Sequence, residues 1–203
     1  MKRIILVCLF SFFNLSGWTQ FNRGVQWTKD GNGYIRLENK EIVQYSLPEG
    51  QKKVLVTAAQ LTPAGQTTSL NVRSYSFSED GLKVLIYTNT QRVWRYDTRG
   101  DYWVLDIVFG KITQIGKKLP AQSLMYAKLS PNGKLVAYGS GHNLFSEDIA
   151  SGKLTQLTFD GTRKLINGTF DWAYEEEFGC RDGFRWNPDG TKIAYWQVDA
   201  NKI

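Results

Sequence analysis

The sequence predicts an all-β fold, a partial β-propeller of about three to three and a half four-stranded blades from a larger ring, preceded by a signal peptide. Beyond residue 20 there is almost no helical periodicity, while aromatic residues make up 14% of the chain and glycines number 19. This composition is typical of β-rich proteins with many turns. Two kinds of hairpin also alternate along the chain, with a period near that of propeller blades.

The first kind of hairpin joins two apolar strands through a turn that ends in glycine. It occurs at 75–87 (YSFSEDGLKVLIY), 127–139 (AKLSPNGKLVAYG) and 184–196 (FRWNPDGTKIAYW). The turn glycines, Gly81, Gly133 and Gly190, are 52 and 57 residues apart. Asp-Gly and Asn-Gly favour tight turns because both Gly and Asn tolerate positive φ. The shared order of Ser or Asn, an acid or amide, and Gly favours a genuine repeat over three unrelated hairpins.

The second kind of hairpin falls between the first. It occurs at 42–56, 102–116 and 144–158, each as strand, glycine-containing turn and strand. One hairpin of each kind supplies four strands, which is one propeller blade. Solenoid repeats are shorter, and a β-sandwich does not need this regularity. The stretch 58–70 (AAQLTPAGQTTSL) is predicted to be an exposed loop between blades, and the tryptophans are predicted to pack within blades.

The number of blades predicts that residues 20–203 form an incomplete N-terminal propeller domain. Closed propellers contain four to eight blades, and an open arc leaves unpaired strand edges. We therefore expect the rest of the ring to lie in a longer polypeptide, and we expect the isolated arc to fold poorly.

Residues 1–19 have the layout of a secretory signal peptide. Lys2 and Arg3 precede an apolar run of about ten residues, which is too short to span a bilayer comfortably. Alternatives are an uncleaved membrane anchor and a buried first strand. No small residue precedes Cys8 closely, so there is no lipoprotein cleavage box. The protein is expected to be exported to the periplasm or the cell exterior, membrane-associated if the segment is uncleaved.

Charge and cysteine content exclude some partners. Without Lys2 and Arg3 the net charge falls from +6 to +4, and the other basic residues are scattered among acids. No stripe suited to nucleic acid is present, so no nucleic-acid partner is expected. Only Cys180 follows the signal peptide, which rules out a disulfide within residues 20–203. Cys180 is either a small core residue or the partner of a cysteine outside this segment.

Three adjacent glutamates lie in the aromatic stretch 167–186 (NGTFDWAYEEEFGCRDGFRW). On a helical turn, neighbouring side chains point about 100° apart. Carboxylates held among aromatic rings suit an ammonium, because a pair 4 Å apart gains about 4 kcal/mol at an effective dielectric of 20. A solvated acidic bulge is the alternative, and spacing alone favours it. No metal site is predicted, because no suitable His or Cys spacing accompanies the acids and the run does not match an EF-hand.

Two stretches carry a family resemblance. The segments DWAYEEEF (171–178) and FRWNPDGTKIAYWQVD (184–199) resemble the N-terminal β-propeller domain of dipeptidyl peptidase IV and its relatives, in the prolyl oligopeptidase clan of serine peptidases. Upstream, TQRVWRYDTRGDYWVLDI (90–107) is similar to a family stretch in which a Trp-Arg pair precedes an Asp- and Tyr-rich strand. The resemblance covers essentially the whole chain after the signal peptide.

The resemblance implies an activity and a binding site. Family members remove dipeptides from peptide N-termini, with Pro or Ala preferred in second position, and use no cofactor. By position, Glu176 and Glu177 would grip the substrate's α-ammonium, while Arg95 would lie near its first peptide carbonyl and hold the acids. Supporting residues would be Glu175, which could also be a surface residue, Trp172, Tyr174, Asp171 and Trp94. The partners would be peptides with a free N-terminus and a second copy of the complete enzyme.

The family's chemistry requires an α/β-hydrolase domain, which is absent from this chain. Its nucleophile lies in a Gly-x-Ser-x-Gly elbow, and no such motif occurs here. The single histidine, His142, is expected to be an ordinary loop or blade residue and not a triad base. The chain alone should therefore bind part of a substrate and cut nothing. Two alternatives stay open: a non-catalytic propeller binding module, and a clan member with another specificity. A glycosylation sequon begins at Asn167.

Overall fold

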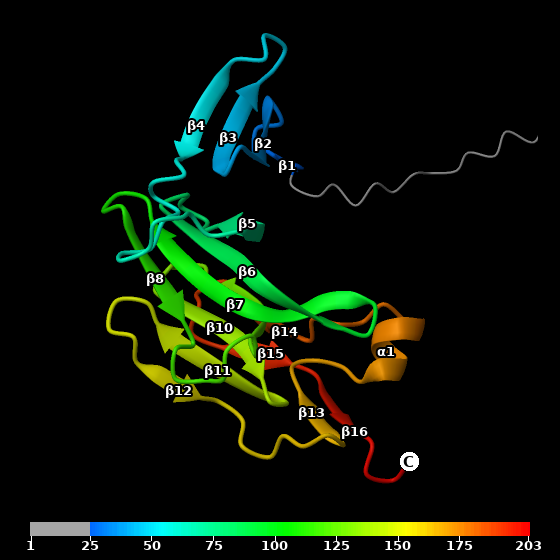
Figure 1. Ribbon diagram of the computed structural model, residues 1–203. Helices are drawn as coiled ribbons and strands as arrows, with labels where there is room; N and C mark the ends of the chain where they lie inside the picture. The colour runs from blue at the N-terminus through cyan, green and yellow to red at the C-terminus, as the bar shows by residue number, and fades with distance from the viewer. Residues whose placement is uncertain (1–24) are drawn as a thin grey trace, which may run out of the picture.

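The structure, a computed structural model, describes residues 25–203; the predicted signal peptide lies outside the described residues. Antiparallel sheets dominate and follow one another along the chain (Figure 1). Three of these sheets have four strands each, paired in sequence order. The all-β prediction is therefore confirmed. No helix within residues 25–203 is long and apolar enough to cross a membrane.

The strands group into four units. The first sheet contains β1 (Val25–Trp27), β2 (Gly33–Glu38), β3 (Glu41–Ser46) and β4 (Lys52–Val56). The second contains β5 (Val72–Phe77), β6 (Lys83–Val93), β7 (Tyr96–Asp106) and β8 (Lys111–Ile115). The third contains β9 (Met125–Leu129), β10 (Leu135–Ser140), β11 (Asn143–Asp148) and β12 (Leu154–Gln156). The last unit pairs β13 (Leu165–Asn167) with β16 (Gln197–Asp199), and β14 (Phe184–Trp186) with β15 (Ile193–Tyr195).

All six predicted hairpins form. They are β3–β4, β5–β6, β7–β8, β9–β10, β11–β12 and β14–β15. The turn glycines Gly81, Gly133 and Gly190 have φ values of 73°, 66° and 70°, a region that favours glycine. In the β5–β6 turn, the Ser78 hydroxyl donates to Asp80 and accepts from the Lys83 amide. These side-chain bonds explain why Ser and Asp recur at fixed places before the glycine.

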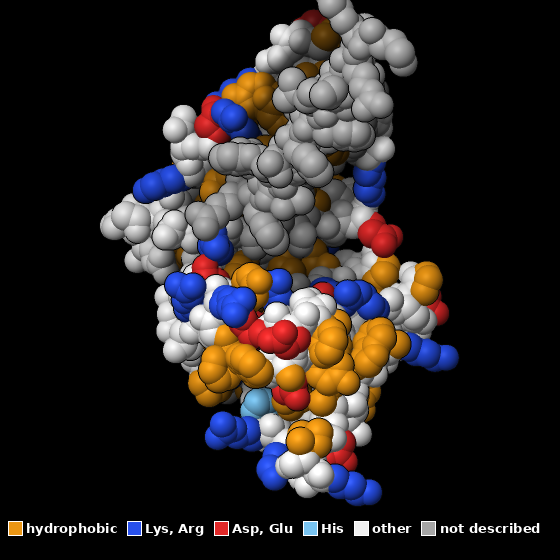
Figure 2. Space-filling view, turned by 90° about the vertical axis from the view of Figure 1, so that its right-hand side faces the viewer, with side chains coloured by type: hydrophobic (Ala, Val, Ile, Leu, Met, Phe, Trp, Pro, Cys, Tyr) orange, Lys and Arg blue, Asp and Glu red, His pale blue; other side chains and the backbone are white. Residues whose placement is uncertain are grey.

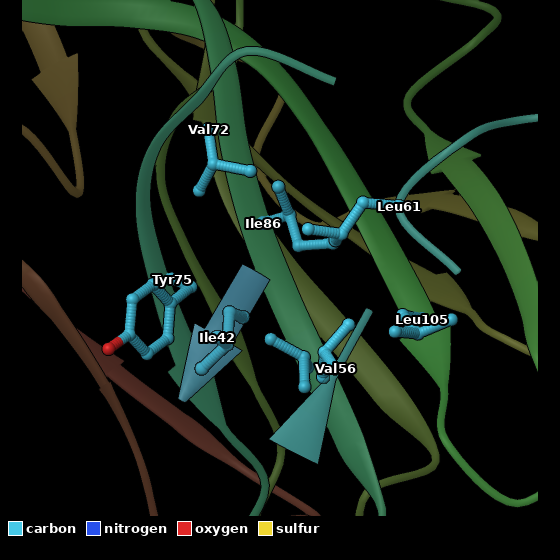
Figure 3. Close-up of a cluster of buried hydrophobic side chains, with 8 residues drawn as sticks. Ile42, Val56, Leu61, Val72, Tyr75, Ile86 and Leu105 are labelled. Carbon is cyan, nitrogen blue, oxygen red and sulfur yellow. The ribbon is translucent and has the colours of Figure 1, made fainter. Parts of the chain in front are cut away.

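The hydrophobic core lies between neighbouring sheets. The first cluster joins Ile42 and Val56 of the first sheet to Ile86 and Leu105 of the second (Figure 3). A second cluster joins the second and third sheets, and a third joins the third sheet to Phe184 of β14. Each sheet thus buries its faces against its neighbours along the chain, as propeller blades do.

The connection 58–70 is not simply the exposed loop that the sequence predicts. Residues 64–68 are exposed, but Leu61 is fully buried in the first cluster (Figure 3). A hydrogen bond from the Leu70 amide to the Leu61 carbonyl closes the loop. One leucine in a polar stretch gives too little periodicity to reveal this burial in the sequence.

The β6–β7 hairpin is longer than its neighbours. Each of its strands has eleven residues, whereas the other strands described have three to six. The hairpin extends beyond its own sheet to the short helix α1 (Trp172–Glu177), which lies between β13 and β14 in the chain (Figure 1). This places the predicted Trp-Arg pair next to the acidic run.

Candidate functional site

Helix α1 carries the acidic run and is defined by its caps. The Asp171 carboxylate accepts a hydrogen bond from the Tyr174 amide at 3.0 Å, which satisfies one free N–H of the first turn. At the other end the Tyr174 carbonyl accepts from the amides of Phe178 and Cys180. Gly179, with φ 65°, then turns the chain away. A six-residue helix is too short to be stable alone, so contacts with the rest of the fold must orient it.

The helix reverses the usual distribution of side chains. Trp172, Tyr174 and Phe178 are exposed. In contrast, Glu175 is only 6% exposed and the Glu176 side chain only 2%. Figure 2 views the molecule from the α1 side and shows acidic side chains with hydrophobic ones on either side. The prediction that tryptophans pack within blades is wrong for Trp172 and for three others, which are also exposed: Trp27, Trp94 and Trp196.

Glu176 lies beside Arg95, which belongs to the tip of the β6–β7 hairpin. The Arg95 Nε is 2.6 Å from Glu176 Oε2, while the Arg95 side chain stays 71% exposed. The two groups are close enough to form an ion pair, but they are not oriented for a hydrogen bond. Neither carboxylate oxygen of Glu176 therefore accepts a hydrogen bond from a described residue. Buried carboxylates normally have such partners. Glu176 is therefore a paired but incompletely satisfied acceptor.

Glu175 faces a different set of partners. Its carboxyl group is 3.4 Å from the Thr98 hydroxyl of β7, a long hydrogen bond between two buried side chains. Burial raises the pKa of Glu175, and the neighbouring Glu176 adds to the rise. Burial also raises the pKa of the Tyr126 hydroxyl, with a contribution from Glu175, and this hydroxyl is buried without a hydrogen-bond partner among the residues described.

Glu177, at the end of α1, is exposed. A hollow of about 510 Å³ lies beside the helix, and its walls include Trp94, Trp172 and Glu175. Glu176, Glu177 and Arg95 are not part of these walls. The structure thus brings Arg95, Glu175 and Glu176 together and leaves Glu177 free to approach a ligand from solvent.

Three other sequence features fall near this site. His142 lines the same hollow, and its pKa is lowered by burial and by the charge of Arg99. Asn167 is fully buried and donates a hydrogen bond to Asp160 at 2.8 Å, so its sequon is inaccessible in the folded protein. Cys180 is half-buried, three residues after the end of α1. Within residues 25–203 no group of His, Cys, Asp and Glu is arranged to hold a metal ion.

The sequence analysis missed Thr98, Tyr126 and Arg181. The Arg181 guanidinium lies 3.5 Å from the centre of the Tyr96 ring, and its charge lowers the pKa of Glu175 against the effect of burial. Only the position of Thr98, three residues after Arg95, could have suggested a role for it. Tyr126 comes from β9, and nothing in the sequence connects it with α1.

The successive antiparallel sheets are those of a propeller domain. Its candidate site is a buried glutamate, Glu176, whose carboxylate accepts no hydrogen bond from a described residue. The sequence profile of the dipeptidyl peptidase IV (DPP IV) N-terminal region matches residues 78–203, more than half of the chain. The chain therefore belongs to this family, as the resemblance implied.

Curated relatives are dipeptidyl aminopeptidases. A probable dipeptidyl-aminopeptidase B of Podospora anserina is 31% identical over 188 residues, covering 89% of this chain and 20% of the relative. A putative dipeptidyl aminopeptidase of Schizosaccharomyces pombe is 27% identical over 164 residues, covering 80% and 20%. The chain spans about a fifth of the length of these relatives.

A solved structure supports the fold. The crystal structure of Porphyromonas gingivalis dipeptidyl peptidase 4 superposes with a TM-score of 0.77 and 24% sequence identity, over 88% of this chain and 25% of that one. At this identity the similarity establishes the fold, which is that of part of a propeller.

Proposed function

We propose that this chain is the substrate-gating part of a serine dipeptidyl peptidase and that Glu176 and Glu177 bind the substrate's free α-ammonium. In this proposal an α/β-hydrolase domain elsewhere in the polypeptide performs the cleavage and releases X-Pro or X-Ala dipeptides. Relatives named as dipeptidyl aminopeptidases support the reaction class.

One observation carries the binding role: the buried Glu176 carboxylate accepts no hydrogen bond in residues 25–203. An ammonium offers three donors, and its hydrogen bonds to a carboxylate are charge-assisted. Exposed Glu177 follows directly and can contact the same ammonium from the solvent side. Arg95 keeps the Glu176 charge compensated before substrate arrives.

The acidic centre also explains selectivity for chain ends. An internal peptide segment has no cation to place against Glu176, and burying the carboxylate under it would leave the charge less well solvated. A peptide anchored by its ammonium presents the bond two residues away. The two glutamates would thus set the distance from the peptide N-terminus to the cleaved bond, and the product would be a dipeptide.

The same proposal extends to the whole protein. Residues 1–19 would be a signal peptide, and the enzyme would be exported to the periplasm or the cell exterior. The complete enzyme would act on peptides as a homodimer. Family resemblance supports this part of the proposal, whose test is the size and location of the mature protein.

The test uses the complete polypeptide and a chromogenic Gly-Pro conjugate with a free amine. Glu176→Gln and Glu177→Gln preserve shape and remove charge. Each should lower kcat/KM about 10- to 100-fold, since a hydrogen bond to a charged group contributes about 1.5–3 kcal/mol. Glu49→Gln, in an exposed turn, is the matched control and should behave as the parent.

Two outcomes would contradict the proposal. Equal cleavage of an N-acylated conjugate would show that no ammonium is required. Unchanged kcat/KM in both variants would favour the alternative interpretation, in which the acidic run is a solvated bulge without a binding role. If the complete polypeptide cleaves nothing but binds free-amine dipeptides through Glu176, the non-catalytic binding module replaces the peptidase.

A further inference from the structure

The tip of the β6–β7 hairpin contacts the α1 segment at three places. Arg95 pairs with Glu176, the Thr98 hydroxyl bonds to Glu175, and the Tyr96 ring stacks against the Arg181 guanidinium. The three hairpin residues lie within three positions of one another in the sequence, and their three partners lie within six. Figure 1 shows the hairpin crossing the molecule to reach α1.

The helix depends on such contacts for its orientation. It has only six residues, and its own caps fix its ends without fixing its rotation about the axis. Rotation matters because Glu175 and Glu176 point about 100° apart. If Glu175 is held in its buried position, the rotation of the helix is fixed, and the directions of Glu176 and Glu177 are then fixed as well.

The buried contacts suit this purpose better than the Arg95 pair does. Arg95 is 71% exposed, and exposed ion pairs restrict a side chain only weakly. Thr98 and Glu175 are both about 6% exposed, so their bond lies out of competing water. Arg181 lines the same hollow as Glu175, and its charge lowers the pKa of that carboxyl group. Its guanidinium lies over the Tyr96 ring of the hairpin. The hairpin therefore contacts the α1 segment at Glu175 and again at Arg181.

We propose that Thr98 and Tyr96 are positioning residues, which orient α1 through Glu175 and Arg181 and so fix the two glutamates that bind the substrate ammonium. This rests on the proposed function of Glu176 and Glu177. It assigns the first glutamate of the run a role of its own, as the buried anchor of the other two. It also explains why the β6 and β7 strands extend beyond their sheet.

The test compares paired variants in the complete polypeptide. Thr98→Val removes the hydroxyl and preserves the shape, whereas Thr98→Ser keeps the hydroxyl. Tyr96→Leu removes the ring, whereas Tyr96→Phe keeps it. We expect Thr98→Val and Tyr96→Leu to raise KM for the Gly-Pro conjugate about 3- to 10-fold, with kcat within about 2-fold. The Ser and Phe variants should match the parent, as should Thr155→Val on the exposed face of β12.

A second readout is independent of activity. Hydrogen exchange of the peptide that spans residues 172–178 should be faster in Thr98→Val and Tyr96→Leu than in the parent. In Glu176→Gln the exchange rate of this peptide should equal that of the parent. In this proposal the helix sets the direction of Glu176, and Glu176 does not set the rotation of the helix. Adding Thr98→Val to Glu175→Leu should change little further, since Glu175→Leu already removes the acceptor of the Thr98 hydroxyl, which a glutamine would keep.

The outcomes separate this inference from the proposed function. If both Glu176→Gln and Glu177→Gln leave kcat/KM unchanged, the ammonium site fails, while exchange at α1 still reports on positioning. If Thr98→Val and Tyr96→Leu leave both α1 exchange and KM unchanged, positioning fails while the ammonium site stands. Equal impairment of Thr98→Ser and Thr98→Val would also overturn it, because the hydroxyl would then be irrelevant. A fall in melting temperature with kcat and KM affected alike would indicate a structural role only.

Discussion

Two buried glutamates illustrate how differently the fold treats the same side chain. Glu147, on β11 of the third sheet, is 7% exposed and accepts hydrogen bonds at 2.8 Å from the Tyr138 hydroxyl and from the Gly116 amide. The Glu176 side chain is 2% exposed, yet it accepts none from residues 25–203. Glu147 links two neighbouring sheets, because its Oε2 accepts both bonds. Glu176 is paired only with Arg95, which is the feature that its proposed role in ammonium binding requires.

The side chains around Glu147 and Glu176 also differ in which of them are buried. Around Glu147 the apolar side chains point inward, and Tyr138 is fully buried. Around Glu176 the aromatic side chains point outward, while Glu175 and Glu176 are buried. A folded blade minimises unsatisfied polar groups, whereas the α1 segment retains them at some cost in stability. We therefore expect substitutions in the blade to affect stability and substitutions in α1 to affect binding.

The largest effect on stability is expected for Glu147→Ala. The substitution leaves the Tyr138 hydroxyl and the Gly116 amide unsatisfied, at about 1–3 kcal/mol each. The propeller transition of the complete polypeptide should fall by about 5 to 15 °C, measured by scanning calorimetry. Specific activity of the folded fraction should stay within about 2-fold of the parent. A thermal transition unchanged within 1 °C would show that these two hydrogen bonds contribute nothing to stability.

Glu176→Gln should show the opposite pattern. Removing an incompletely satisfied buried charge is expected to leave the melting temperature unchanged or to raise it by about 1–3 °C. The same variant loses affinity for a free-amine dipeptide, measured by titration calorimetry. Glu147→Gln is the matched control, because the chemical change is the same in a carboxylate that accepts two hydrogen bonds. If both variants were destabilised alike, the two glutamates would not differ in the way described.

Much of this architecture could be predicted from the sequence, because local rules determine it. The hairpins at 75–87, 127–139 and 184–196 follow from turn residues whose side chains bond to their own backbone, and these contacts are short-range. The burial of Leu61 and the reach of the β6–β7 hairpin could not be predicted in this way. Both depend on what lies next to a segment after folding.

Some residues of the candidate site could likewise be predicted from local sequence motifs, and others could not. The acidic run and the Trp-Arg pair are recognisable as motifs, so Glu176 and Arg95 were found from the sequence. Thr98 and Tyr126 have no motif and are brought to Glu175 only by the arrangement of β7 and β9. Which of three adjacent glutamates is buried also depends on the rotation of α1. Spacing alone could not determine it.

A smaller, pH-dependent effect is expected at Glu175. Burial raises the folded-state pKa of this carboxyl group above its ordinary value of 4.5, so the folded protein binds the proton more tightly than the unfolded chain does. The stabilising contribution of the protonated form is present below pH 4.5 and is lost as the pH rises through the folded-state pKa. Glu175→Gln does not titrate, so its melting temperature relative to the parent should increase from acid to neutral pH. A difference that is constant with pH would contradict this assignment.

The smallest effect on stability is expected on the outer side of α1. Phe178 is 72% exposed, and its ring packs only against Tyr174 among the described aromatic residues, at 5.8 Å. Phe178→Ser should therefore change the free energy of unfolding by no more than about 0.5 kcal/mol, measured by denaturant titration. The same variant measures what the exposed aromatic side contributes to binding. If KM for the free-amine substrate also stays constant, binding depends on the glutamates of α1 and not on this exposed ring. A rise in KM at constant stability would extend the binding surface to the aromatic side chains, and the acidic run and the exposed rings would then be two parts of one site.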